Sequence, residues 1–201
     1  MRIGLRHSAV VSPITVNNQP LKWENEISYL GIKILSAKKF TINLQQVRQK
    51  FFRALNGIFG KVGLKTSPVV LTSLIESYCV PIMLYSSESI CWTKAMFNSC
   101  EHAYSLAFMK IFKTFDKNVV QQCQYFMGQM PFELKIVSKQ INFLINLQNS
   151  PNNICRILSH DIDQDCASLC KLYNIDFPCH LLTKTIVKCG LWKFFTDKVF
   201  I

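Results

Sequence analysis

The fold is decided by the apolar stretch Ile27-Ser28-Tyr29-Leu30-Gly31-Ile32-Lys33-Ile34 and by the long basic helix predicted after it, over residues 43–59. In that helix, apolar residues recur every three or four positions, which predicts one buried face. The face comprises Leu44, Val47, Phe51, Phe52, Leu55, Ile58 and Phe59. The short apolar stretch before it is typical of a strand, so this part of the chain joins β structure to α structure.

The opposite face of the same helix carries cations and amides but no carboxylate. It presents Gln46, Gln49, Lys50, Arg53, Asn56 and Lys61. Because no acid nearby neutralises these charges, the face is suited to gripping a phosphate backbone. The alternative is an ordinary solvated face, since runs of charge on helices are more often solvated than functional. Arg48 lies beside the apolar stripe, where it either reaches past the stripe to solvent or pairs with an acid.

The net charge of the 201-residue chain is +11, and most of it lies in the first third. Residues 1–65 contain eleven Lys and Arg against Glu24 and Glu26 only, and eleven minus two gives +9 of the +11. An anionic partner is the simplest use for this imbalance, with phosphate backbones ahead of membrane surfaces. Hydrophobic residues make up 49% of the chain, which is enough for a packed core.

Cysteine content and apolar run length indicate the compartment. Nine cysteines, an odd number, occur without an N-terminal apolar block of signal-peptide length. No stretch approaches the roughly 20 apolar residues of a membrane span. We therefore expect an intracellular protein, nuclear or cytoplasmic, with free thiols and no membrane partner.

Turn and cap residues predict a mainly α fold with a small β portion. The pair Asn17-Asn18 tolerates positive φ and predicts a tight hairpin over residues 14–21. Residues 27–35 read as a second strand, in which Gly31 marks a bulge or a close backbone approach. A hairpin with so few partners does not stand alone in water, so we expect residues 1–36 to form the edge of a larger sheet.

Residues 41–148 read as a helical bundle. Ser67 and Pro68 begin one helix, and Pro81 is expected to kink or break it. Thr93 caps another helix over residues 94–112, and helices follow over residues 119–127 and 131–147.

The loop at residues 149–153 is the clearest boundary in the sequence. It separates the bundle from a C-terminal tail, residues 149–201, in which we expect two short helical pieces and several cysteines. The chain therefore divides into residues 1–40, 41–148 and 149–201.

Several sequence blocks carry a family resemblance by their order and spacing. They are Arg2-Ile3-Gly4, residues 14–23, Ile27-Ser28-Tyr29-Leu30-Gly31, residues 48–63, residues 79–88, Phe108-Met109-Lys110-Ile111-Phe112 and Gln122-Cys123-Gln124-Tyr125-Phe126. Together they resemble the reverse transcriptases of non-LTR retrotransposons, of the LINE type and jockey-like, over residues 2–147. The family has Gly where this chain has Ser86, and this departure indicates some drift.

The resemblance implies a role for two parts of the chain. Residues 1–36 would be the last palm strands, and the helices after them would be the thumb that holds an RNA/DNA primer–template duplex. The family's block at Tyr29, Leu30 and Gly31 lies close to the primer end. The thumb would contact phosphates through Lys50 and Arg53, with further cations nearby at Lys38, Lys39, Lys61 and Lys65.

The chemistry of polymerisation is missing from this sequence. Two-metal phosphoryl transfer needs carboxylates close together, but the chain has no adjacent acidic pair and no Asp before Asp116. By resemblance the paired aspartates would precede residue 1, along with the fingers and most of the palm. We therefore expect no catalytic residue, no cofactor and no small-molecule substrate here, because the Mg²⁺ ligands of the parent enzyme are absent.

Two groups of ligand-type side chains are candidate metal sites. Asp161, Asp163 and Asp165 lack the Gly and distal Glu of a calcium loop and read as a solvated helix N-terminus. The tail contains Cys155, His160, Cys166, Cys170, Cys179, His180 and Cys189 without any Cys-x-x-Cys. Buried thiols are the main prediction there, and a zinc-stabilised DNA-binding domain is an alternative. A further alternative is a protein-interaction module or an inert retroelement relic, whose exposed apolar edge binds a partner or aggregates.

Overall fold

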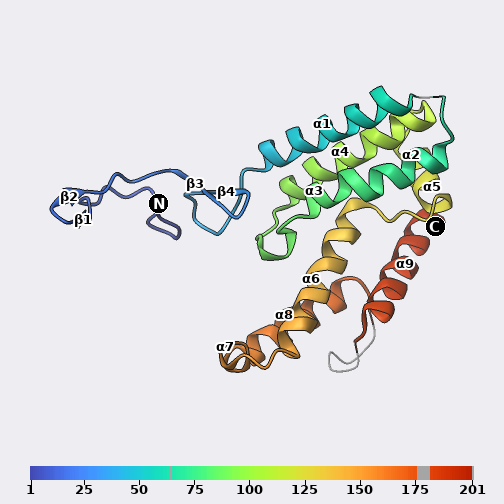
Figure 1. Cartoon of the computed structure of the whole chain (residues 1–201). Helices are drawn as coiled ribbons and strands as arrows, with labels where there is room; N and C mark the ends of the chain where they lie inside the picture. The colour runs from blue at the N-terminus through green and yellow to red at the C-terminus, as the bar shows by residue number, and fades with distance from the viewer. Residues whose placement is uncertain (64, 176–181, 201) are drawn as a thin grey trace.

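The computed structural model describes residues 1–63, 65–175 and 182–200, in which an arm of two β-hairpins leads into a body of helices (Figure 1). Strand β1 (Thr15–Val16) pairs antiparallel with β2 (Gln19–Pro20), and β3 (Glu26–Tyr29) pairs antiparallel with β4 (Ile32–Leu35). The prediction of a mainly α fold with a small β portion is confirmed.

The turn of the first hairpin was predicted correctly, whereas the second hairpin was predicted as a single strand. Asn17 and Asn18 adopt φ of 51° and 64° between β1 and β2, as predicted for a tight hairpin. The single strand predicted over residues 27–35 is instead a hairpin, because Leu30 at φ 45° and Gly31 at φ 81° form a two-residue turn. Positive φ at both central residues is what a short hairpin turn requires, although Leu is uncommon there.

A first hydrophobic core lies between three helical segments that run side by side (Figure 1). They are α1 (Leu44–Val62), the run that begins with α2 (Pro68–Leu74), and α4 (Lys94–Phe112). The side chains of Asn43 and Thr93 cap α1 and α4 by accepting the backbone N–H groups of Gln46 and Met96. The core contains, among others, Phe51, Leu55, Phe59, Leu71, Ile75, Met83, Cys100, Tyr104 and Phe108.

The predicted break at Pro81 is wrong, because the helix continues past it. After α2 the chain widens into a π-helical segment, Ile75–Cys79, and returns to α-helix in α3 (Val80–Leu84). Pro81 thereby falls in the first turn of α3, where a missing backbone N–H is tolerated.

Among the described residues, the helical run Pro68–Ser89 is long and apolar enough to cross a membrane, and its most apolar 18 residues have a mean hydropathy of 1.5. It is an exception to the prediction that no stretch approaches a membrane span. A single helix of this kind is weak evidence for a membrane, because core helices of globular proteins can be as long and as apolar.

A second core forms around α6 (Phe132–Gln148), which also takes part in the first core. Phe132 and Ile136 face the first core, while Val137 and Ile141 face the second. Helices α5 (Lys117–Phe126), α8 (Ser159–Leu172) and α9 (Lys184–Phe200) also contribute side chains to it. The short helix α7 (Asn153–Ile157) has no buried residue and contacts α6 and α8. The tail after residue 149 is thus more helical than the short pieces predicted, and it packs on α6. The three-part division of the chain stays a prediction.

Candidate nucleic-acid interface

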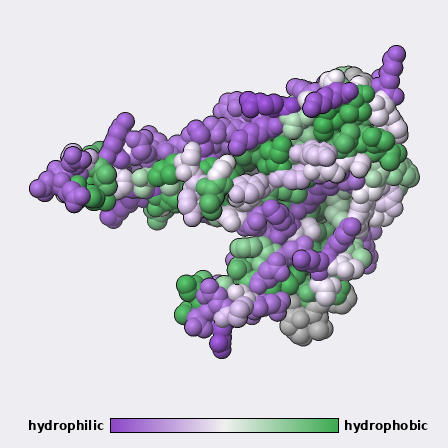
Figure 2. All heavy atoms as spheres, viewed as in Figure 1, coloured by the Kyte–Doolittle hydropathy of each residue, from purple (hydrophilic) through white to green (hydrophobic). Residues whose placement is uncertain are grey.

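The outer face of α1 is exposed from Gln49 to Lys61. Lys50, Arg53 and Lys61 are exposed, while Phe51 and Leu55 on the opposite side are 0% and 3% exposed. This separation follows from the 3.6-residue period of the helix. Figure 2 shows hydrophilic residues along α1, on the upper side of the body. No acidic residue occurs in α1, so the face has positive charge only.

The cations of this region are not neutralised by ion pairs in the described part of the chain. The ion pairs found there are Lys22–Glu24, Lys33–Glu26, Lys135–Glu76 and Lys139–Glu88. None involves a predicted phosphate-binding residue. The structure places Lys50, Arg53 and Lys61 on α1, Lys38 and Lys39 in the connection between β4 and α1, and Lys65 beyond the end of α1, all of them exposed.

Arg48 turns towards the protein rather than joining this face. It is half-buried, and its Nε atom is buried without a hydrogen-bond partner in the described residues. Its charge acts on the Cys100 thiol, whose pKa burial raises to about 11 while Arg48 opposes that increase. Arg48 is therefore not counted among the phosphate-binding candidates.

The Leu30–Gly31 turn lies against α1 and the end of α3. The hydroxyl of Tyr85 donates a hydrogen bond to the Leu30 carbonyl at 2.9 Å, and Lys50 Nζ lies 3.5 Å from the Gly31 carbonyl, at the limit of hydrogen bonding. The turn itself stays open to solvent, since Tyr29 and Leu30 are 60% and 71% exposed. The structure thus brings the block at residues 29–31 next to Lys50.

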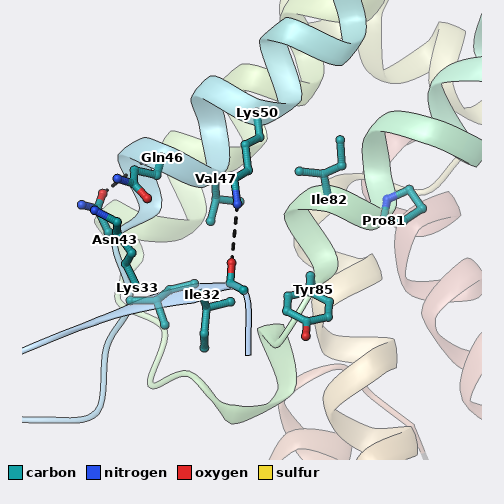
Figure 3. Close-up of a pocket in the computed structure, with 11 residues that line it drawn as sticks. Ile32, Lys33, Asn43, Gln46, Val47, Lys50, Pro81, Ile82 and Tyr85 are labelled. Carbon is teal, nitrogen blue, oxygen red and sulfur yellow. Dashed lines mark hydrogen bonds between the residues drawn. The ribbon is translucent and has the colours of Figure 1, made fainter. Parts of the chain in front are cut away.

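A pocket of about 290 Å³ lies at this junction (Figure 3). Ile32 on the hairpin, Val47 on α1 and Ile82 on α3 give it an apolar wall, and Asn43, Gln46 and Tyr85 add polar groups. Sequence reasoning did not assign Tyr85 to the site. The signal that could have found it is its position in the block at residues 79–88.

The acid nearest to the start of α1 is already paired. Lys33 and Asn43 donate hydrogen bonds to the Glu26 carboxylate at 2.5 and 3.0 Å. These two hydrogen bonds, that of Lys33 first, hold the pKa of Glu26 below its usual value, against a small opposing effect of burial. Glu26 therefore stays ionised near neutral pH with Lys33 as its counter-ion, and the charges of Lys50 and Arg53 remain available.

The ligand-type side chains of the tail do not assemble a metal site in the described residues. Cys166 and Cys170 are buried on α8, as predicted for buried thiols, whereas His160 and Cys189 are exposed. Cys179 and His180 lie outside the described residues. Gln148, the last residue of α6, donates a hydrogen bond to Asp163 on α8 at 2.6 Å, and Asp161 and Asp165 are exposed.

Comparison with protein-family models, with curated proteins and with solved structures gave no match for this chain. The family resemblance of the sequence blocks therefore stays a prediction.

Proposed function

We propose that this chain is the palm end and thumb of a non-LTR retrotransposon reverse transcriptase, and that it binds an RNA/DNA duplex along α1. The observation that carries the binding role is the outer face of α1. Lys50, Arg53 and Lys61 are exposed there, α1 has no acid, and no ion pair in the described residues uses these cations.

The dimensions of α1 suit a phosphate backbone. At 1.5 Å per residue, Lys50 and Lys61 are about 16 Å apart along the helix axis. That length corresponds to roughly five base pairs at 3.4 Å each. Contacts of this kind neutralise phosphates and release counter-ions, so binding depends on salt and hardly on base sequence. Duplex geometry and the RNA 2′-hydroxyls would then matter more than base identity.

The proposed role is binding without polymerisation. These 201 residues contain no adjacent acidic pair to hold two Mg²⁺ ions, so the catalytic carboxylates must come from another segment. The remaining palm and fingers of the parent polymerase are the other proposed partners. We also propose an intracellular site of action, in the nucleus or the cytoplasm, where such a duplex would be found.

The salt dependence of duplex binding tests this function. Replacing Lys50 and Arg53 by Ala together removes two phosphate contacts, so the slope of log K against log salt should fall by about two. The measurement is fluorescence anisotropy with a blunt RNA/DNA hybrid at several salt concentrations.

The matched control is Lys171→Ala with Lys188→Ala, which removes the same charge from exposed positions on α8 and α9. Its slope should stay near that of the parent protein. Equal slopes for the two double variants would show that net charge, rather than the face of α1, governs binding.

The arm favours a second function, a non-enzymatic interaction module or an inert relic. Its apolar side chains are unusually open, with Leu5 80%, Val10 102% and Ile14 56% exposed. Exposed apolar side chains of this kind bind a partner or promote self-association. Gel filtration and the hybrid-binding assay together distinguish the two functions. Self-association that grows with protein concentration, combined with no affinity for the hybrid, supports the second function alone.

A further inference from the structure

A groove of about 480 Å³ lies between α1 and α4, beside the outer face of α1. Helix α1 contributes Phe52 and Asn56, and α4 contributes Met109 and Lys110. Lys113 and Phe115, just after α4, also line the groove. The groove therefore has an apolar and aromatic lining together with two cations and an amide.

Phe115 is the most unusual residue of this groove, because its side chain is 90% exposed. A single exposed aromatic residue is ordinary in itself. Here, however, the backbone on both sides is fixed. The Thr114 N–H bonds the Met109 carbonyl at 3.2 Å, and the Asp116 N–H bonds Thr114 Oγ1 at 3.3 Å. The backbone that carries the ring is thus held at the edge of the groove, and binding would cost little additional ordering of the main chain.

The charges of the groove are positive. Lys110 Nζ lies 4.5 Å from the centre of the Phe59 ring, which keeps the ammonium group close to α1. No acidic residue lines the groove among the described residues. Asp116, next to Phe115 in the chain, uses its carboxylate to cap α5 by accepting the Asn118 N–H at 2.8 Å. The complementary ligand is therefore anionic and has a flat apolar face.

We propose that this groove binds an unpaired nucleotide that continues a strand of the duplex held along α1. Its base stacks on Phe115, and its phosphate lies by Lys110 and Lys113. Asn56 is three residues after Arg53 and so adjoins it on the surface of α1, which makes the groove continuous with the phosphate-binding face. This inference rests on the proposed duplex binding and adds a single-stranded extension to the ligand.

The test compares two labelled RNA/DNA hybrids by fluorescence anisotropy with the full chain, one blunt and one with a four-nucleotide single-stranded extension. Stacking of one base on an aromatic ring predicts at least about fivefold tighter binding of the extended hybrid. Phe115→Ala should remove this advantage and leave the blunt hybrid unaffected, and Phe115→Tyr should keep it. Lys110→Ala with Lys113→Ala should reduce it.

The matched control is Phe126→Ala, which removes another exposed ring, 75% exposed, at the end of α5. This variant should keep the advantage of the extended hybrid. The inference is wrong if wild-type protein binds both hybrids equally, or if Phe115→Ala and Phe126→Ala behave alike. If the wild-type protein binds neither hybrid, the proposed duplex binding itself is rejected. If Phe115→Ala weakens binding to phosphatidylserine vesicles and not to the extended hybrid, the groove is a lipid site and the inference falls.

Discussion

The arm and the helical body of this protein solve the problem of burial differently. In residues 1–42 only Ile34 and Ile42 are buried, whereas the body has two cores that share α6. Helices satisfy their own backbone hydrogen bonds and need only one covered face, but a two-stranded hairpin leaves an edge and a face without partners. The arm therefore depends on its contacts with the body.

The same difference bears on the proposed function. The body presents charge on a rigid helix, and the arm presents backbone carbonyls on a turn that Tyr85 holds from the body. A proposed duplex site made of α1 and the Leu30–Gly31 turn would join the two regions.

The largest expected effect separates the two regions by stability. Phe51 is fully buried in the first core, and Val11 in the arm is 49% exposed. Phe51→Ala should lower the free energy of unfolding by about 3–5 kcal/mol, because it removes a buried ring and leaves a cavity. Val11→Ala should leave it nearly unchanged. Urea unfolding followed by circular dichroism measures both, and similar effects would mean that the arm folds as part of the body.

An intermediate effect is expected from the ion pairs of the two regions. Lys135 and Glu76 lie 2.8 Å apart with side chains 14% and 19% exposed, and Tyr104 also donates to this carboxylate. In the arm, Lys22 and Glu24 are 3.8 Å apart with side chains 86% and 55% exposed.

Lys135→Met should therefore lower the free energy of unfolding by about 2–3 kcal/mol, since Glu76 is left without its counter-ion. The loss is somewhat smaller than for a fully buried ion pair, because both side chains are partly exposed. Lys22→Met should cost almost nothing, because exposed pairs are screened by water. Thermal unfolding compares the two variants, and a loss in Lys135→Met no larger than in Lys22→Met would contradict this expectation.

The smallest effect is a difference in the sign of pH dependence between two carboxylates. Burial raises the pKa of Glu101 in α4, although hydrogen bonds from the start of α6 oppose the increase. The pKa of Glu26 in the arm is lowered by the hydrogen bonds from Lys33 and Asn43. The two groups therefore titrate on opposite sides of the ordinary carboxyl value near 4.5.

For Glu101 the folded state holds the proton more tightly than the unfolded state, so its contribution to stability falls as pH rises through 4.5 towards its raised pKa. For Glu26 the unfolded state holds the proton more tightly, so stability is lost as pH falls from 4.5 through its lowered pKa. NMR titration of the two side-chain carboxyl carbons measures both midpoints. Midpoints in the reverse order would contradict the environments described for the two groups.

Local signals in the sequence accounted for much of this structure. The apolar period of residues 43–59 predicted α1 and its exposed cations, Asn17-Asn18 predicted the first turn, and Thr93 predicted the start of α4. Each of these depends on residues within about one or two turns of one another. The sequence also predicted that Lys50 and Arg53 share a face, because residues three positions apart in a helix are neighbours on its surface.

Contacts between distant segments were beyond such signals. Leu30 in a positive-φ turn contradicts its usual preference, and Tyr85, 55 residues later, bonds its carbonyl. Pro81 did not break its helix because the π-helical segment before it changes the hydrogen-bonding pattern of the backbone. The groove at Phe115 needs α1 and α4 side by side, which no local period specifies.

The sequence by itself determined the helices, their buried stripes and the sign of the charge, since these follow from residue type and spacing along one element. Only the tertiary structure decided that α6 serves two cores, that Arg48 turns inward while Lys50 stays exposed, and that the Leu30–Gly31 turn lies by α1. The physical reason is that packing joins residues far apart in the chain, and the free energy of those contacts exceeds local preference.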